Sequence, residues 1–324
     1  MDKKGSFRMS PPKRLPKVGF VLLGMIAFFW GIGWPIMKIA LSEMGPWIFR
    51  SFCLLFGGLG VFAIAKANRS WSAIPKGEFR PLLIVAFFNV TGWHLASAYG
   101  LTFMHAGRAA IVGFTMPVWA SLLAVLLLKE QMNSSRLIGL GFGVAGLAVL
   151  LGSDLRVLGT APLGTALMLM AAMSNAAGVV FLKYFRWTIS TFNLTGWQLI
   201  LGCIPVLLGT LILEPVSGFL HITSQAAFAT TFMVLVPGVL CTWAWFKVIQ
   251  LFPAGIAAIG TLAVPVVGVL SSAVVLGEPI GLQEIVALLL LIAAVSIVML
   301  KPEGFSRSSG AAGVRTESAG EKVP

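Results

Sequence analysis

Apolar runs of about twenty residues recur along most of the chain, with short polar segments between them. Each run is long enough, as a helix, to cross a hydrocarbon core about 30 Å thick. The pattern predicts ten transmembrane helices, at about residues 18–41, 47–65, 80–101, 106–128, 134–152, 162–184, 191–213, 226–248, 254–276 and 281–300. Because these runs are uniformly apolar, whereas the strands of a barrel alternate, we expect an all-α membrane protein.

One stretch of the chain returns later as a second copy. Residues 105–131, HAGRAAIVGFTMPVWASLLAVLLLKEQ, match residues 253–279, PAGIAAIGTLAVPVVGVLSSAVVLGEP, without a gap. Each copy carries a central proline and ends with a glutamate close to its last residue. The duplication predicts two repeats of five helices, residues 18–152 and 162–300. Because five is odd, the second repeat enters the membrane from the opposite side, and the repeats are inverted.

The composition indicates a membrane chain without a sizeable soluble domain. Of the 324 residues, 58% are hydrophobic and only 10% are charged, whereas soluble domains are about 25% charged. The net charge of +12 comes mainly from Lys and Arg in the tails and in alternate loops. This bias places both termini in the cytoplasm. Residues 1–17 are then a cytoplasmic tail, and residues 301–324 a disordered cytoplasmic tail. The lipid bilayer is the expected partner, not nucleic acid.

The sequence gives no support for metal, cofactor or enzyme chemistry. Cys53, Cys203 and Cys241 lie within apolar runs and lack metal-ligand spacing, which is typical of core packing. No Asp or Glu falls in the middle of an expected helix, and no catalytic motif is present. We therefore expect no metal, no cofactor and no enzymatic activity. A membrane enzyme or receptor is a remote alternative, because it would need a polar catalytic cluster or a large extramembrane domain.

Several motifs resemble a known family. They are Phe29-Trp30-Gly31, Lys38, Pro46, Arg50 and the doubled stretch Ala106-Gly107-Arg108-Ala109-Ala110…Pro117…Glu130 with its second copy. Over residues 18–300 the chain resembles the EamA family of the drug/metabolite transporter superfamily, and most of all its bacterial amino-acid exporters. The resemblance implies a monomeric inner-membrane exporter or exchanger of amino acids, other metabolites, sugars or drugs. It also implies a central cavity lined mainly by the first, third, fourth, sixth, eighth and ninth helices.

Lys38 and Arg50 are the first candidates for substrate binding. Both lie about one helical turn from the expected outer face of the membrane. Long basic side chains at this depth often reach back to the interface, which is one interpretation. The other is a basic pair at the mouth of the cavity that binds a substrate carboxylate. Arg50 suits bidentate carboxylate binding better than Lys38.

Neutral and titratable polar residues inside the expected helices are further candidates. His94, in the middle of the third helix, is either a neutral, hydrogen-bonded side chain or a cavity ligand that can take a proton. Asn89, five residues earlier, shares the helix face of His94 only in part, and Tyr99 is best treated as independent. Asn175 and Gln198 carry more weight than Ser or Thr, which usually bond to their own helix.

Aromatic and proline residues complete the candidate set. Trp30 and Trp34 are spaced i, i+4 and share a helix face, and Trp243 also lies inside an expected helix. Several such rings make an aromatic-lined cavity plausible, suited to a flat or apolar substrate side chain. Pro117 and Pro265 occupy equivalent places in the two repeats and are either hinges for alternating access or static kinks.

Together these features predict a transporter that exports small metabolites by alternating access, with amino acids, aromatic ones included, as the favoured substrates. Alternatives on the same fold are sugars, nucleobases and lipophilic cations; cations would favour aromatic groups and fewer basic ones in the cavity. Without acids in mid-membrane, the energy source is substrate exchange or facilitated diffusion, unless His94 couples transport to protons.

Overall fold

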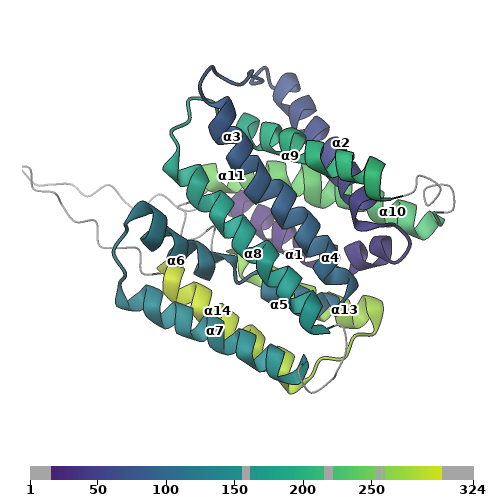
Figure 1. Ribbon diagram of the computed structural model, residues 1–324, viewed down its shortest axis with the longest axis vertical. Coiled ribbons are helices and arrows are strands. Elements are labelled where there is room, and N and C mark those ends of the chain that lie inside the picture. The colour runs from purple at the N-terminus through teal and green to yellow at the C-terminus, as the bar shows by residue number, and fades with distance from the viewer. Residues whose placement is uncertain (1–15, 155–160, 215–221, 253–256, 258–259, 301–324) are drawn as a thin grey trace, which may run out of the picture.

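The computed structural model describes residues 16–154, 161–214, 222–252, 257 and 260–300, and the regular elements in these ranges are all helical (Figure 1). The helices are α1 (Lys17–Leu41), α2 (Pro46–Ala67), α3 (Phe79–Ala86), α4 (Trp93–Thr102), α5 (Ala106–Gly113), α6 (Met116–Leu128), α7 (Ser134–Asp154), α8 (Ala161–Tyr184), α9 (Thr191–Leu213), α10 (Ser224–Met233), α11 (Thr242–Leu251), α13 (Ala263–Leu276) and α14 (Leu282–Leu300). The predicted tails lie almost wholly outside the described residues.

Seven helical segments of the described chain are long and apolar enough to cross a membrane. They are Lys17–Leu41, Pro46–Ala67, Phe79–Thr102, Ala106–Leu128, Pro162–Tyr184, Thr191–Leu213 and Ser224–Leu251. Three further apolar helices are shorter: Ser134–Leu150, Ala263–Leu276 and Leu282–Val298. The chain is therefore a multi-pass membrane protein, and its described regular elements are all helical. The count of ten crossings stays a prediction.

The third predicted helix of each repeat is interrupted in the same way. A π-helical segment, η1 (Phe87–Gly92), joins α3 to α4, and another, η3 (Val234–Cys241), joins α10 to α11. Pro237 lies inside η3 and lacks the N–H that a regular helix would use. Such segments widen the turn, leave the α-helical register and are frequent at functional sites.

The fourth predicted helix is also divided. α5 ends at Gly113 and α6 begins at Met116, directly before Pro117. Thr115 satisfies its own hydroxyl at this break by donating to the carbonyl of Val112 (2.6 Å). In the second repeat α13 begins at Ala263, two residues before Pro265. Both prolines therefore occupy the first turn of a helix, where proline is tolerated.

The two repeats pack into each other rather than side by side. α2 packs against α9, α7 against α14 and α1 against α13, while α8 packs against α4 and α6. Figure 1 shows the α7–α14 pair as a separate layer below the other helices. Small residues permit the closest contacts: a Cβ at Gly100 would lie 3.1 Å from the carbonyl oxygen of Gly164 in α8. Every such pair joins one predicted repeat to the other.

Candidate substrate-binding cavity

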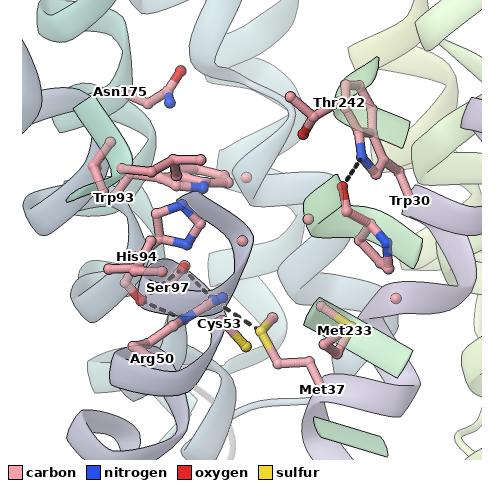
Figure 2. Close-up of a pocket in the computed structure, with 18 of the residues that line it drawn as sticks. Trp30, Met37, Arg50, Cys53, Trp93, His94, Ser97, Asn175, Met233 and Thr242 are labelled. Carbon is pink, nitrogen blue, oxygen red and sulfur yellow. Dashed lines mark hydrogen bonds between the residues drawn. The ribbon is translucent and has the colours of Figure 1, made fainter. Parts of the chain in front are cut away.

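A cavity of about 380 Å³ lies among helices from both predicted repeats. Its wall comes from α1, α2, η1, α4, α5, α6, α8, α9, α10, η3, α11 and α13, and Figure 2 shows many of the lining side chains. Six of the residues proposed from the sequence line it: Trp30, Trp34, Arg50, His94, Asn175 and Gln198. Among the described residues of the wall, Arg50 is the one permanently charged side chain, and none is a carboxylate.

Arg50 is held firmly in the wall and is only 4% exposed. Its Nε donates to the backbone carbonyl of His94 (2.9 Å), and its Nη2 donates to the hydroxyl of Ser97 (3.0 Å) and lies 2.8 Å from the sulfur of Met37. These bonds orient the planar guanidinium from three sides (Figure 2). Nη1 has no hydrogen-bond partner among the described residues and is not an enclosed atom, so it has access to the cavity.

Within the described chain, no Asp or Glu forms an ion pair with Arg50. A buried charge without a counter-ion is costly in a membrane protein and marks a functional position. Because Nε and Nη2 are engaged, the free N–H groups lie on Nη1 alone, so the expected two-nitrogen fork is not open and Nη1 would donate a charge-assisted hydrogen bond to a carboxylate. The cavity therefore offers one preorganised site for an anionic group.

His94 lies beside Arg50 and accepts a hydrogen bond from it through its backbone carbonyl. Figure 2 shows the imidazole between Trp93 and the Arg50–Ser97 pair. Its Nδ1 is enclosed and has no hydrogen-bond partner among the described residues. The carbonyl of the same residue accepts from both Arg50 and Ser97, the latter at 3.1 Å. His94 thus holds the guanidinium in place and contributes its ring to the wall.

Apolar side chains form most of the remaining wall. Trp30 donates its indole N–H to the carbonyl of Pro237 (3.4 Å), which ties α1 to the π-helical segment η3. The tip of the Trp34 ring would lie 3.1 Å from a Cβ at Gly113, so the glycine gives that ring its place against α5. Phe114, Met116 and Met233 add further apolar surface. Rings and thioethers of this kind suit a large apolar or flat substrate group.

The structure places three sequence candidates outside the cavity wall. Lys38 donates to the backbone carbonyl of Met104 and lies 3.9 Å from the carboxylate of Glu278. Tyr99 accepts a hydrogen bond at 2.6 Å from the indole of Trp47. Trp243 packs against a separate apolar cluster around Ile26 and Phe252. Pro117 and Pro265, proposed as hinges, do not line the cavity either.

Other lining residues carry no strong signal in the sequence. Trp93 and Ser97 of α4, Met37 of α1 and Thr242 of α11 belong to the wall, as does Asn89 of η1. A helical wheel drawn through residues 80–101 lets Asn89 share the face of His94 only in part. The π-helical segment between them adds residues to the turn and brings both to the cavity.

Carboxylates also join the repeats at the end of the bundle where α1 stops and α2 starts, here named the Glu278 end. Glu214 accepts the backbone N–H of Trp47 (3.2 Å) and of Ile48 (2.8 Å), at the start of α2. Glu43 accepts the backbone N–H of Thr223 (2.9 Å), at the start of α10. A negative group at a helix N-terminus is stabilising, so these contacts favour the packing of the two repeats at the Glu278 end.

The opposite end of the bundle, where α6 stops, is named the Glu130 end.

A multi-pass helical bundle whose two halves enclose a mainly apolar cavity with a few oriented polar groups is typical of a membrane transporter. A model of the EamA-like transporter family matches residues 17–152 and again residues 162–300. The chain belongs to this family.

Individual relatives agree with this class. The uncharacterized transporter YoaV of Bacillus subtilis is 27% identical over 84% of this chain and 94% of its own. Probable amino-acid metabolite efflux pumps of Salmonella typhimurium and Escherichia coli are 26% and 25% identical, over 87% and 84% of this chain and 94% and 91% of theirs. A crystal structure of another protein aligns with this chain with a TM-score of 0.60 and 20% sequence identity, over 87% of this chain and 97% of the other. The two proteins therefore share a fold.

Proposed function

We propose that this transporter exports small metabolites that carry a carboxylate, above all amino acids, aromatic ones included, by alternating access of the central cavity. The observation that carries the proposal is Arg50, a buried guanidinium that faces the cavity and has no carboxylate partner among the described residues. A substrate carboxylate would supply the missing counter-ion. The aromatic wall around Trp30 and Trp93 would bind the substrate side chain.

Alternating access is supported by contacts between the repeats at both ends of the bundle. At the Glu278 end, Glu43 and Glu214 bind backbone N–H groups of the opposite repeat. At the Glu130 end, Glu78 accepts the backbone N–H of Thr188 (2.8 Å) and Glu130 pairs with Lys183. Opening either end would require its own set of contacts to separate, while the other set holds.

Export from a bacterial cytoplasm is supported by the charge distribution and by relatives. With both termini inside, as the Lys and Arg distribution predicts, the Glu278 end faces outward across the inner membrane. Two relatives are named as probable amino-acid metabolite efflux pumps. Lipophilic cations are a weaker candidate, because Arg50 would repel them in a cavity whose described residues include no acid.

The test is uptake into liposomes that hold the purified protein, with labelled Trp, Phe, Thr, Met and choline, with and without a pH gradient. We expect uptake of the amino acids and not of choline. Arg50→Gln should lower amino-acid uptake at least 10-fold, and Arg50→Lys should fall between, because an ammonium keeps the charge but cannot make all the hydrogen bonds that hold the guanidinium against His94 and Ser97. Transport of choline alone, or an unchanged Arg50→Gln protein, would overturn the proposal.

Two controls make the result specific to the site. Arg186→Gln removes an exposed arginine in the α8–α9 loop and should transport as the wild type does. Thermal unfolding in detergent should show that Arg50→Gln is folded, since replacing an unpaired buried charge by a neutral group carries no desolvation penalty of its own. A strict dependence of uptake on the pH gradient would point to His94 as a coupling group.

A further inference from the structure

Three amide side chains form a continuous chain of hydrogen bonds in the cavity wall. Asn175 of α8 donates from its Nδ2 to the Oδ1 of Asn89 in η1 (2.9 Å). Asn89 in turn donates from its Nδ2 to the Oε1 of Gln198 in α9 (2.8 Å). All three residues line the cavity. The chain therefore joins three helical segments from both predicted repeats.

Both ends of this amide chain are open to the cavity. The carbonyl oxygen of Asn175 and the amino group of Gln198 have no hydrogen-bond partner among the described residues, and neither atom is enclosed. One end thus presents an acceptor and the other presents donors. Leaving such groups unpaired in a membrane is costly, so they pair with water or with a ligand.

The backbone around Asn89 packs closely against α8. A Cβ at Gly178 of α8 would lie 2.5 Å from the Cβ and 2.8 Å from the backbone nitrogen of Asn89, so only a glycine lets α8 approach η1 this closely. Ser174, one turn earlier on α8, donates to the carbonyl of Phe88 (2.7 Å) and so satisfies an acceptor in the π-helical segment. These contacts fix the position of the Asn89 backbone against α8.

Arg50 and the amide chain lie at different depths. Arg50 is four residues from the start of α2 at the Glu278 end, about 6 Å along the helix axis. Gln198 is seven residues from the start of α9 at the Glu130 end, about 10 Å along its axis. Figure 2 shows Asn175 on the far side of Trp93 and His94 from Arg50. The cavity thus has a charged pole and a neutral pole with aromatic groups between them.

The sequence repeat gives the two poles a common origin. Gln198 stands in the second repeat where Arg50 stands in the first, 148 residues apart, the same offset as between the two long copies. Their helices, α2 and α9, pack against each other. Equivalent positions of the two repeats therefore carry a cation, Arg50, in the first repeat and a neutral amide, Gln198, in the second. The two ends of the cavity thus differ in charge.

We propose that the Asn175–Asn89–Gln198 chain is a second subsite, which binds an uncharged hydrogen-bonding group at the end of the substrate remote from its carboxylate. The inference rests on the proposed function, because the carboxylate is bound by Arg50. Substrates that fit are amino acids whose side chains end in an amide, a hydroxyl or an indole N–H. A purely apolar side chain would leave both open ends of the amide chain without a ligand partner.

Selectivity follows from this pairing. A site that hydrogen-bonds a polar group discriminates against an isostere without it more strongly than an apolar pocket discriminates by size. Water can enter this cavity and replace part of the lost bonding, which moderates the effect. We expect glutamine to exceed methionine, and tyrosine to exceed phenylalanine, by about 10-fold in transport kcat/KM.

The experiment measures these two pairs in liposomes containing the full-length protein. Asn175→Leu should bring both ratios close to one, mainly by lowering transport of glutamine and tyrosine, while methionine and phenylalanine change little. Gln198→Met provides a second variant that removes the donor end. The matched control is Gln250→Leu, which removes an exposed amide on α11 away from the cavity and should keep the wild-type ratios.

The outcomes separate this inference from the proposed function. Equal transport of both members of each pair by the wild type would overturn the subsite and leave the carboxylate site intact. Loss of all transport in Arg50→Gln with preserved ratios in Asn175→Leu would do the same. If no carboxylate is transported at all, the proposed function fails first. Because the wild-type ratios need no variant, the test holds even if a substitution prevents folding.

Discussion

Glu278 accepts hydrogen bonds from two consecutive backbone N–H groups of the opposite repeat, that of Ala106 at 2.7 Å and that of Gly107 at 3.0 Å. These groups begin α5, so the carboxylate caps this helix from the α13–α14 loop. Among the described residues, Glu130, which follows the equivalent helix of the first repeat, binds the side chains of Arg136 (2.5 Å) and Lys183. Two residues in matching positions of the sequence repeat thus each make described contacts with the opposite repeat, Glu278 at one end of the bundle and Glu130 at the other.

The cap on α5 predicts that removing Glu278 costs more than breaking the two described side-chain pairs of Glu130. Glu278→Ala leaves two N–H groups at a helix start without their acceptor and should lower the free energy of unfolding by about 1–2 kcal/mol. Glu130→Ala breaks pairs near the surface and should cost no more than about 1 kcal/mol. Thermal unfolding of both variants in the same detergent measures the difference. Equal losses would contradict the capping role of Glu278.

Cys53 offers a native reporter of access to the cavity. It lines the cavity wall, whereas Cys203 and Cys241 are buried, at 1% and 0% exposure. In a protein carrying Cys203→Ala and Cys241→Ala, a membrane-impermeant thiol reagent should label Cys53, and a bound substrate should slow the labelling several-fold. Reagent applied from each side of oriented vesicles would show which end is open. Labelling unaffected by every transported substrate would place the substrate elsewhere.

Gly178 should tolerate no side chain, because a Cβ there would overlap the backbone of Asn89. Gly178→Ala should destabilise the protein by about 1–3 kcal/mol, the usual cost of overpacking, and reduce transport at least 10-fold by displacing η1. The control is Gly141→Ala in α7, where nothing lies within 4 Å of an added Cβ. That variant should be neutral or slightly stabilising, because alanine favours helix. Unfolding temperature and uptake are measured on both.

The Glu130–Lys183 pair should make stability depend on acid pH. The hydrogen bond from Lys183 is the main cause that holds the pKa of Glu130 below its usual 4.5, and Arg136 adds to it. The contact therefore stabilises the folded state fully above pH 4.5, and this contribution is lost as the pH falls through the lowered pKa. Glu130→Gln should unfold at a lower temperature than the wild type at pH 7, and the difference should shrink in strongly acidic buffer. A difference that grows with acidity would give the pair the opposite sign.

Much of the architecture follows from the sequence, because crossing a hydrocarbon core requires long apolar helices and a duplicated stretch requires a duplicated structure. The candidate site follows in part. Arg50, His94, Asn175 and Gln198 stand out as polar residues inside apolar runs, and all four line the cavity. Their binding of substrate stays a prediction until transport is measured.

The rest depends on geometry that a regular helix does not predict. In the sequence, Lys38 is as good a candidate for substrate binding as Arg50. Its side chain nevertheless reaches the carbonyl of Met104 and the carboxylate of Glu278 rather than the cavity. With 3.6 residues per turn, Asn89 matches the face of His94 only in part, whereas the wider turn of η1 brings both residues to the cavity. Which face of a helix points inward is decided by packing, and the sequence records that only indirectly.

Arg50 has an electrical consequence. Its guanidinium keeps its charge at any working pH, and the described wall around it holds no anion. When the cavity opens first to one face of the membrane and then to the other, the voltage drop shifts past this charge even if the side chain stays still. A full charge crossing the whole field is worth about 2.3 kcal/mol per 100 mV. A bound monoanion would cancel that charge and a bound zwitterion would not, so the voltage dependence of substrate exchange would reveal which of the two the protein carries.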